Sequence, residues 1–339
     1  MMNDEILDNY KEAGKLAAKI LHEGAQGIRV GGSYLELVDS VEDRIRAEGA
    51  DLAFPLNVSL NEDAAHDTAS PGDERVFAKG DVVKFDLGVQ IEGYVADTAT
   101  TVDLGNNSLL LDASRAALDA AIACIRPGVT TGEIGAAIER EIVTRGYRPI
   151  ANLTGHGLDQ YVAHMDPSIP NIAISGGTVL EEGMAIAIEP FATTGSGRVG
   201  EKTRVEIYSQ IAEKPVRTPS AREVMEKVKE RRGLPFSRRW LNDKKAGLAL
   251  IGLSSSLCLF HAGLLARIQL VRGISTRRPP FMADSWAQTP AMVQLAARAA
   301  STADSRSSRI ARTNSCARCG WEPPCPAPWT NEVCPCSSS

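Results

Sequence analysis

Two aspartates, Asp86 and Asp97, stand on a segment whose alternating apolar residues predict a β-hairpin. If Ile91 and Glu92 form the turn, Asp86 and Asp97 lie directly opposite each other, with Cβ atoms about 4.5–5.5 Å apart. Two buried carboxylates at that separation repel each other strongly unless a cation lies between them. A pair of divalent metal ions meets this need. The alternative is a solvated hairpin with two surface acids, which the apolar flanking residues disfavour.

Two further candidate ligands are His156, in a glycine-flanked loop, and Glu189, which ends an apolar stretch before a proline. Two aspartates, one glutamate and one imidazole form an oxygen-rich set that suits pairs of Mn, Co, Fe or Zn in hydrolysis. Three of the five histidines, His66, His156 and His164, fall in loops of this kind. A structural role is a fair alternative for any one of them, but not for all three together.

The elements that must position these residues alternate between helices and strands. Apolar residues spaced by three and four positions predict helices around residues 6–20, 33–49, 113–126 and 130–146. The second and the fourth begin with a capping box, in which Ser or Thr is followed three residues later by Glu, and both end at a glycine.

These two helices match each other at a constant offset of 97 residues, for example Ser33 with Thr130 and Gly49 with Gly146. Farther along, a glycine also begins each strand that carries Asp86 or Glu189, with the acid six residues after it. Such self-similarity indicates an internal duplication. We therefore expect an α/β domain of two similar halves, with the active site between them.

The composition changes near residue 253. Residues 1–253 contain 28 Lys and Arg against 38 Asp and Glu, a net charge near −10, which argues against a nucleic-acid-binding face. Their single cysteine, Cys124, is typical of a thiol packed in a reducing compartment. The polar, acidic N-terminus is unlike a signal peptide, so we expect a cytoplasmic protein.

Residues 254–339 contain nine Arg, no Lys, 13 Ser and six of the seven Cys, in no clear period. Cys316 and Cys319 could form half of a zinc site, but the second pair of ligands is missing. The uncharged stretch 246–266 is long enough to span a bilayer, yet it straddles the change in composition and contains three serines and a histidine. We expect no membrane span, and we expect a disordered or non-native tail.

Six motifs resemble, in type and order, those of type II methionine aminopeptidases, most closely the archaeal form. They are FPLNVSLN (54–61) with His66, KFDLG (84–88), ADTA (96–99), TGH (154–156), His164 with SIPN (168–171), and IEPFA (188–192). The resemblance covers residues 1–253, about three quarters of the chain. It implies the pita-bread α/β fold of two pseudo-symmetric halves, with a helical insertion at about 193–253 in the second half.

The resemblance also implies an activity: a dimetal hydrolase that removes the N-terminal methionine from nascent proteins with a small second residue. Asp86 would bind one metal ion, Asp97 would bridge both, and His156 and Glu189 would bind the other. The metals would be two divalent ions of Co, Mn, Fe or Zn.

Three more residues receive substrate roles from the resemblance. His66 and His164 would contact the substrate, one near the scissile amide and one positioning the peptide, and Phe54 would help form the methionine pocket. The implied partners are nascent polypeptide N-termini close to the ribosome. We expect a monomer that binds neither nucleic acid nor membrane.

One feature of the family pattern is missing. The family has a fifth ligand, a bridging Glu in a strand motif close to Gln-Phe-Glu-His-Thr, and the internal repeat calls for an acid opposite Glu189. The only acids after residue 253 are Asp284, Asp304, Glu322 and Glu332, none of them in a β-rich run. This predicts a missing last strand, an open sheet edge and uncertain activity. The alternative function is a non-catalytic pita-bread binding protein.

Overall fold

The computed structural model describes residues 2–213, 215–241, 250 and 253, together with strand backbone within 265–298. All of these lie in the first of two compact units, Met1–Thr302. The helices are α1 (Asp4–Gly27), α2 (Tyr34–Ala47), α3 (Ser108–Cys124), α4 (Thr131–Thr144) and α5 (Pro219–Glu230), with a 3₁₀ turn at Arg238–Leu241.

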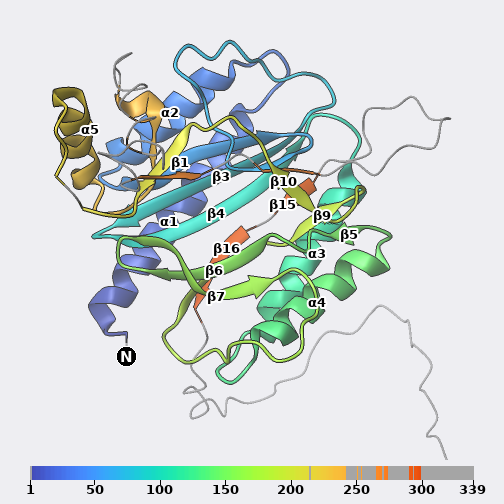
Figure 1. The fold of residues 1–339 in the computed structure, drawn as a ribbon. Helices are drawn as coiled ribbons and strands as arrows, with labels where there is room; N and C mark the ends of the chain where they lie inside the picture. Colours follow the sequence, from blue (N-terminus) through green and yellow to red (C-terminus); the bar gives the residue numbers. More distant parts are fainter. Residues whose placement is uncertain are drawn as a thin grey trace, which may run out of the picture. The chain divides into compact units, whose positions relative to one another are not determined.

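Seven strands form one sheet in the order β1-β3-β4-β16-β8-β6-β7 (Figure 1). Their bounds are β1 (Asp51–Leu60), β3 (Val82–Ile91), β4 (Tyr94–Asp103), β6 (Thr154–Asp159), β7 (Val162–Pro170), β8 (Ala185–Ile188) and β16 (Gln294–Arg298). Three smaller sheets contain β2 (Asp63–Ala65), β5 (Arg148–Pro149), β9 (Phe191–Thr193), β10 (Val199–Glu201), β11 (Ile207–Gln210), β12 (Phe236–Ser237), β13 (Leu265–Ile268), β14 (Val271–Gly273) and β15 (Pro290–Met292).

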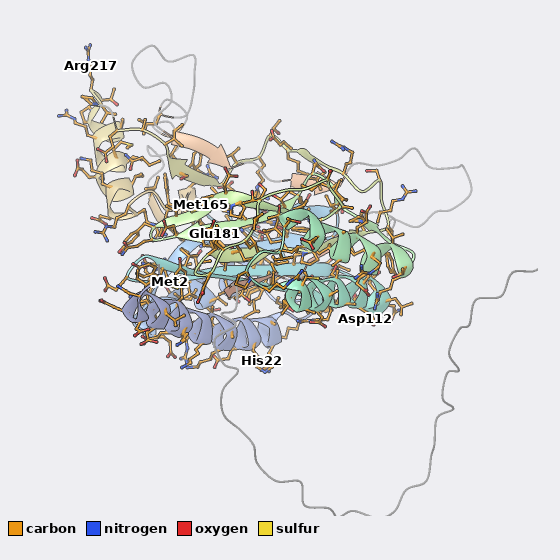
Figure 2. The ribbon with its side chains drawn as sticks, turned by 90° about the horizontal axis from the view of Figure 1, so that it is seen from below. Met2, His22, Asp112, Met165, Glu181 and Arg217 are labelled. Atoms are coloured by element: carbon orange, nitrogen blue, oxygen red, sulfur yellow. The ribbon has the colours of Figure 1, made fainter. Side chains whose placement is uncertain are left out.

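Helices α1 to α4 cover one face of the large sheet, as the view in Figure 2 shows, with His22 of α1 and Asp112 of α3 on the same side. Side chains of α1 and α2 pack on β1 and β3, and side chains of α3 and α4 pack on β7 and β8, in two separate apolar clusters. Each half of the chain thus has its own core. None of the helices in the described part of the chain is long and apolar enough to cross a membrane.

The repeat predicted from sequence is confirmed. Helices α2 and α4 are offset by 97 residues at both ends, and each half has an isolated bridge just before its helix, Ser33 to Val76 and Thr130 to Val179. Thr130 makes a complete capping box with Glu133. In the sheet, β1, β3 and β4 of the first half correspond to β6, β8 and β16 of the second, so the junction between the halves falls between β4 and β16.

The predicted hairpin register was wrong. Ile91 pairs with Tyr94, so Glu92 and Gly93 form the turn, and their φ angles of 51° and 88° are those of a type I′ turn. Asp86 therefore lies opposite Ala99, and Asp97 lies opposite Gly88. The two carboxylates are diagonal neighbours on the same face of the sheet rather than a directly opposed pair.

The expected open edge was also wrong, because β16 pairs with both β4 and β8 and fills that place in the sheet. Residues 290–298 contain no acid, so this strand brings no carboxylate. The other predictions for the tail, including the cysteine pairs, concern residues outside the described part of the chain. The insertion is not purely helical, since it combines α5 with β10, β11 and β12. Helix α3 begins five residues before the predicted start.

Candidate metal centre and active site

The alternation along β3 divides its side chains between the two faces of the sheet. Phe85, Leu87 and Val89 pack in the core beneath α1 and α2. Asp86, at the intervening position, therefore points to the face opposite those helices. It lines a small pocket of about 30 Å³ whose other lining residues are Phe54, Asn57, Ala65, His66, Asp97, His164, Glu189, Ile207 and Pro235.

Three of the four predicted ligand residues, Asp86, Asp97 and Glu189, line this pocket, and the fourth, His156, contacts two of them. Nε2 of His156 lies 2.9 Å from Oε1 of Glu189 and 3.4 Å from Oδ2 of Asp97. The ligand atoms of these three residues all lie within 4.8 Å of one another. Asp86 lines the same pocket, is buried, and accepts a hydrogen bond of 3.3 Å from Nδ2 of Asn57. Asp86 and Asp97 come from the first half, His156 and Glu189 from the second.

The three predicted substrate residues are also at the pocket. His66 has a φ of 64°, a left-handed conformation that costs free energy for a residue with a side chain. The ring of His164 lies 4.3 Å from the ring of His156. Phe54 faces Gly88 across β1 and β3, and a Cβ on Gly88 would lie 2.4 Å from the Phe54 ring. Glycine at 88 therefore leaves room for the aromatic wall beside Asp97.

Glycines on both sides of His156 serve a similar purpose. A Cβ on Gly155 would lie 2.2 Å from the carbonyl oxygen of Ala187, and one on Gly157 would lie 2.4 Å from that of Asp166. At these two positions, strand β6 therefore lies closer to its neighbours than a residue with a Cβ atom would permit. This close approach brings the His156 imidazole to the carboxylates.

An ion-pair network holds the segment that follows His66. It consists of Asp67, Asp73, Arg75, Arg204, Glu206 and Arg238. Arg75 contacts Asp67 at 2.5 Å and Asp73 at 2.7 Å, and Arg204 donates to Ser70 Oγ at 2.9 Å. Since Glu206 precedes Ile207 of the pocket, the network ties His66 and the insertion to one another.

The acid cluster changes the pKa values of its members. Burial, and then repulsion from Asp97 and Glu189, raises the pKa of Asp86 well above its usual range. Burial lowers the pKa of His156, but the carboxylates of Asp97 and Glu189 outweigh it and raise this pKa to about 11. Although His164 lies at an exposed position, loss of water around its ring and the neighbouring His156 and His66 lower its pKa, so its imidazole is neutral.

These residues fit a divalent metal centre. Within the described structure, the buried Oδ1 of Asp86 has no hydrogen-bond partner. This oxygen could serve as a ligand to a cation, and the cation would relieve the repulsion among the carboxylates. Carboxylate oxygens with one imidazole nitrogen are a donor set that divalent transition metals accept.

Metal binding is expected to release protons. The pKa of His156, raised to about 11, means that its imidazole holds a proton at neutral pH without metal, and the raised pKa of Asp86 acts in the same direction, whereas metal ligands must be deprotonated. The affinity should therefore rise as pH rises through the neutral range. Calorimetry in two buffers of different ionisation enthalpy measures the protons released, which we expect to be about one or more per cation. Equal binding heats in both buffers would contradict the assignment.

A larger cavity lies elsewhere. It measures about 370 Å³ and is lined by residues of α1, β4, β7 and the 158–160 turn, among them Met2, Tyr10 and Met165. Within the described residues, one group of side chains could hold a metal ion, namely Asp97, His156 and Glu189. None of these three lines the larger cavity. The chemistry belongs to the smaller pocket.

Sequence reasoning missed four lining residues: Asn57, Ala65, Ile207 and Pro235. Asn57 had a signal, because an amide in the otherwise apolar run of β1 is costly to bury without a purpose. Ile207 and Pro235 come from the insertion, and no local pattern indicates that the insertion reaches the pocket.

Comparison with known proteins places these observations in context. Residues 8–216 match the sequence profile of metallopeptidase family M24. The methionine aminopeptidase of Archaeoglobus fulgidus is 51% identical over 246 residues, covering 72% of this chain and 84% of that protein. That of Pyrococcus horikoshii is 44% identical over 270 residues, covering 78% and 92%.

Solved structures agree on the fold. A methionine aminopeptidase from Thermotoga maritima superimposes with a TM-score of 0.56 at 31% identity, covering 59% of this chain and 85% of that one. A thermophilic Arx1 superimposes with a TM-score of 0.74 over 87% of this chain and 88% of its own, at 18% identity. The second similarity concerns the fold alone.

Proposed function

Because the chain belongs to metallopeptidase family M24, we propose that it is a methionine aminopeptidase, a metal-dependent exopeptidase that removes N-terminal methionine. The observation that supports this proposal is the grouping of Asp97, His156 and Glu189 beside a pocket that Asp86, His66 and His164 line. We propose two divalent cations, of Co, Mn, Fe or Zn. Such cations supply an acidified water and polarise the carbonyl group that is cleaved.

The chain's own residues bind and orient the peptide. Phe54 and Ile207 offer apolar surface for the methionine side chain at the pocket wall. The neutral imidazole of His164 can donate or accept one hydrogen bond, and His66 lines the same pocket as the carboxylates. One of these two histidines lies near the scissile amide and the other positions the peptide. We propose that a tight rim restricts the second residue to small side chains.

The proposed partners are the N-termini of nascent chains near the ribosome. We propose that the protein acts on them as a monomer in the cytoplasm. The negative net charge of the whole chain supports a protein substrate rather than a nucleic acid. A second function, non-catalytic binding, is favoured by one observation: β15 and β16 contain no acid where the family pattern has its fifth ligand.

The test is methionine release from a Met-Ala-Ser peptide during a metal titration. It compares the chain as it stands with a chain in which residues after 253 are replaced by a family-like ending with a Gln-Phe-Glu-His-Thr strand. The restored chain should release methionine, and it should prefer Met-Ala-Ser to a peptide with a bulky second residue. If the restored, metal-loaded chain releases none, non-catalytic binding is the better description.

His66→Ala in the restored chain should reduce turnover by about 100-fold or more while metal content stays nearly intact. One oriented group in an active site contributes on that order. The two readouts are steady-state kinetics and metal analysis of the same preparation. His22→Ala, on the exposed face of α1, is the matched control and should change neither. Loss of metal from the His66 variant would instead identify His66 as a ligand.

A further inference from the structure

Asn57 is a buried amide in the pocket wall that nothing above explains. It lies on β1 and is 5% exposed. Its Nδ2 donates to Oδ2 of Asp86 at 3.3 Å. Its Oδ1 is buried and has no hydrogen-bond partner within the described structure. A buried amide oxygen left without a donor costs about 1–3 kcal/mol, so such a group in a binding pocket indicates a missing partner.

The chemistry of the neighbour fixes which way the amide points. The NH₂ of Asn57 is the group that faces Asp86, since its Nδ2 donates to Oδ2 there, and a carboxylate that binds a metal ion is deprotonated and only accepts. Turning the amide over would place two acceptors against each other. The carbonyl oxygen is therefore the group of Asn57 that is left for a ligand, on the pocket wall that Phe54 and Asp86 also line.

Besides the methionine side chain, an aminopeptidase must recognise the free N-terminal ammonium of its substrate. This is a donor with three N–H groups and a positive charge, and it suits an acceptor beside a carboxylate. We propose that Oδ1 of Asn57 accepts a hydrogen bond from the α-ammonium of the substrate, so that Asn57 selects peptides with a free amino terminus. The proposal rests on the proposed function, since it assumes that the pocket holds an N-terminal methionine.

The experiment uses the full, metal-loaded chain and two ligands that need no turnover: L-methionine and 4-(methylthio)butanoate, which is methionine without its amino group. Ligand-observed NMR and calorimetry give the affinity ratio of the two, and metal analysis accompanies each variant. The parent should prefer methionine, and Asn57→Leu should reduce that preference by about 10-fold or more, as expected for a hydrogen bond to a charged group. Affinity for the butanoate should stay within about twofold, since the ligand lacks the donor.

Asn57→Asp separates substrate binding from mere support of Asp86. This variant keeps an acceptor at Oδ1 but loses the Nδ2 donor, so it should retain the preference for methionine. If it loses the preference as Asn57→Leu does, Asn57 acts only by positioning Asp86 and the proposal is overturned. Asn152→Leu is the matched control, because it removes two hydrogen bonds to Val199 away from the pocket. It should leave the preference unchanged.

Two further outcomes would also overturn the proposal. In the first, the parent binds both ligands equally, which contradicts ammonium recognition while leaving the methionine pocket intact. In the second, the parent binds neither ligand, which contradicts the proposed function together with the role of Asn57. The two failures are therefore distinguishable.

Discussion

Asp97→Ala should abolish metal binding. The carboxylate is buried, lies 3.4 Å from Nε2 of His156 and belongs to the one group of three ligand residues found in the described structure. Without this carboxylate, the two cations would repel each other with less negative charge between them, so the remaining acids could not hold both. Calorimetry with Mn²⁺ and Co²⁺ measures the loss, and turnover in the restored chain should fall to background.

Asp119→Ala is the control, because Asp119 is an exposed acid on α3. It should leave both stoichiometry and affinity unchanged. Two cations bound to the Asp97 variant with unaltered affinity would show that Asp97 is not a ligand.

The chain as it stands should bind at most one metal ion tightly and show peptidase activity near background. Residues 290–298, which supply β15 and β16, contain no acid, so the carboxylate expected opposite Glu189 is missing. The ion it would have helped to hold has fewer anionic ligands and binds more weakly. Restoring the family-like ending should recover two metals and methionine release. Both are read by calorimetry and by the Met-Ala-Ser assay.

Robust activity of the unmodified chain would contradict this expectation and would mean that another acid substitutes for the missing ligand. Glu322→Ala and Glu332→Ala would then identify it. The composition of residues 254–339, with nine Arg and no Lys, suggests a hypothesis: translation in a wrong frame or past a missed splice. Resequencing the gene tests it, and an alternative frame without a Glu-containing strand motif after codon 253 would refute it.

The two-half architecture was predictable because its signals are local. Capping residues and terminal glycines mark α2 and α4, and repeating them at one spacing reveals the duplication. The ligand and substrate residues of the pocket were predictable for the same reason, because each lies in a short, recognisable motif, whereas Ile207 and Pro235 of the insertion do not. The grouping of the ligand and substrate residues then follows from the sheet order.

Other features depend on interactions that no local pattern records. The hairpin turn was misplaced by one residue, which shifts the pairing by two, because Glu92 and Gly93, not Ile91 and Glu92, adopt positive φ. Glycine is favoured at the second central residue of a type I′ turn, so Gly93 was the available signal. The ion-pair network was not predictable, since Ser70 and Glu206 are 136 positions apart and meet only in the folded chain.

The division of the ligand residues between the two halves has a consequence for folding. Each half has its own helix pair and its own apolar core, so each can hold together without the other's ligands. A cation held by Asp86 and Asp97 from one half and by His156 and Glu189 from the other would act as a removable cross-link across the junction. Anything that binds only the assembled state stabilises it by mass action. Removal of the metal by a chelator should therefore weaken the pairing of β4 with β16 before either apolar core unfolds. The metal centre would then stabilise the fold in addition to its role in catalysis.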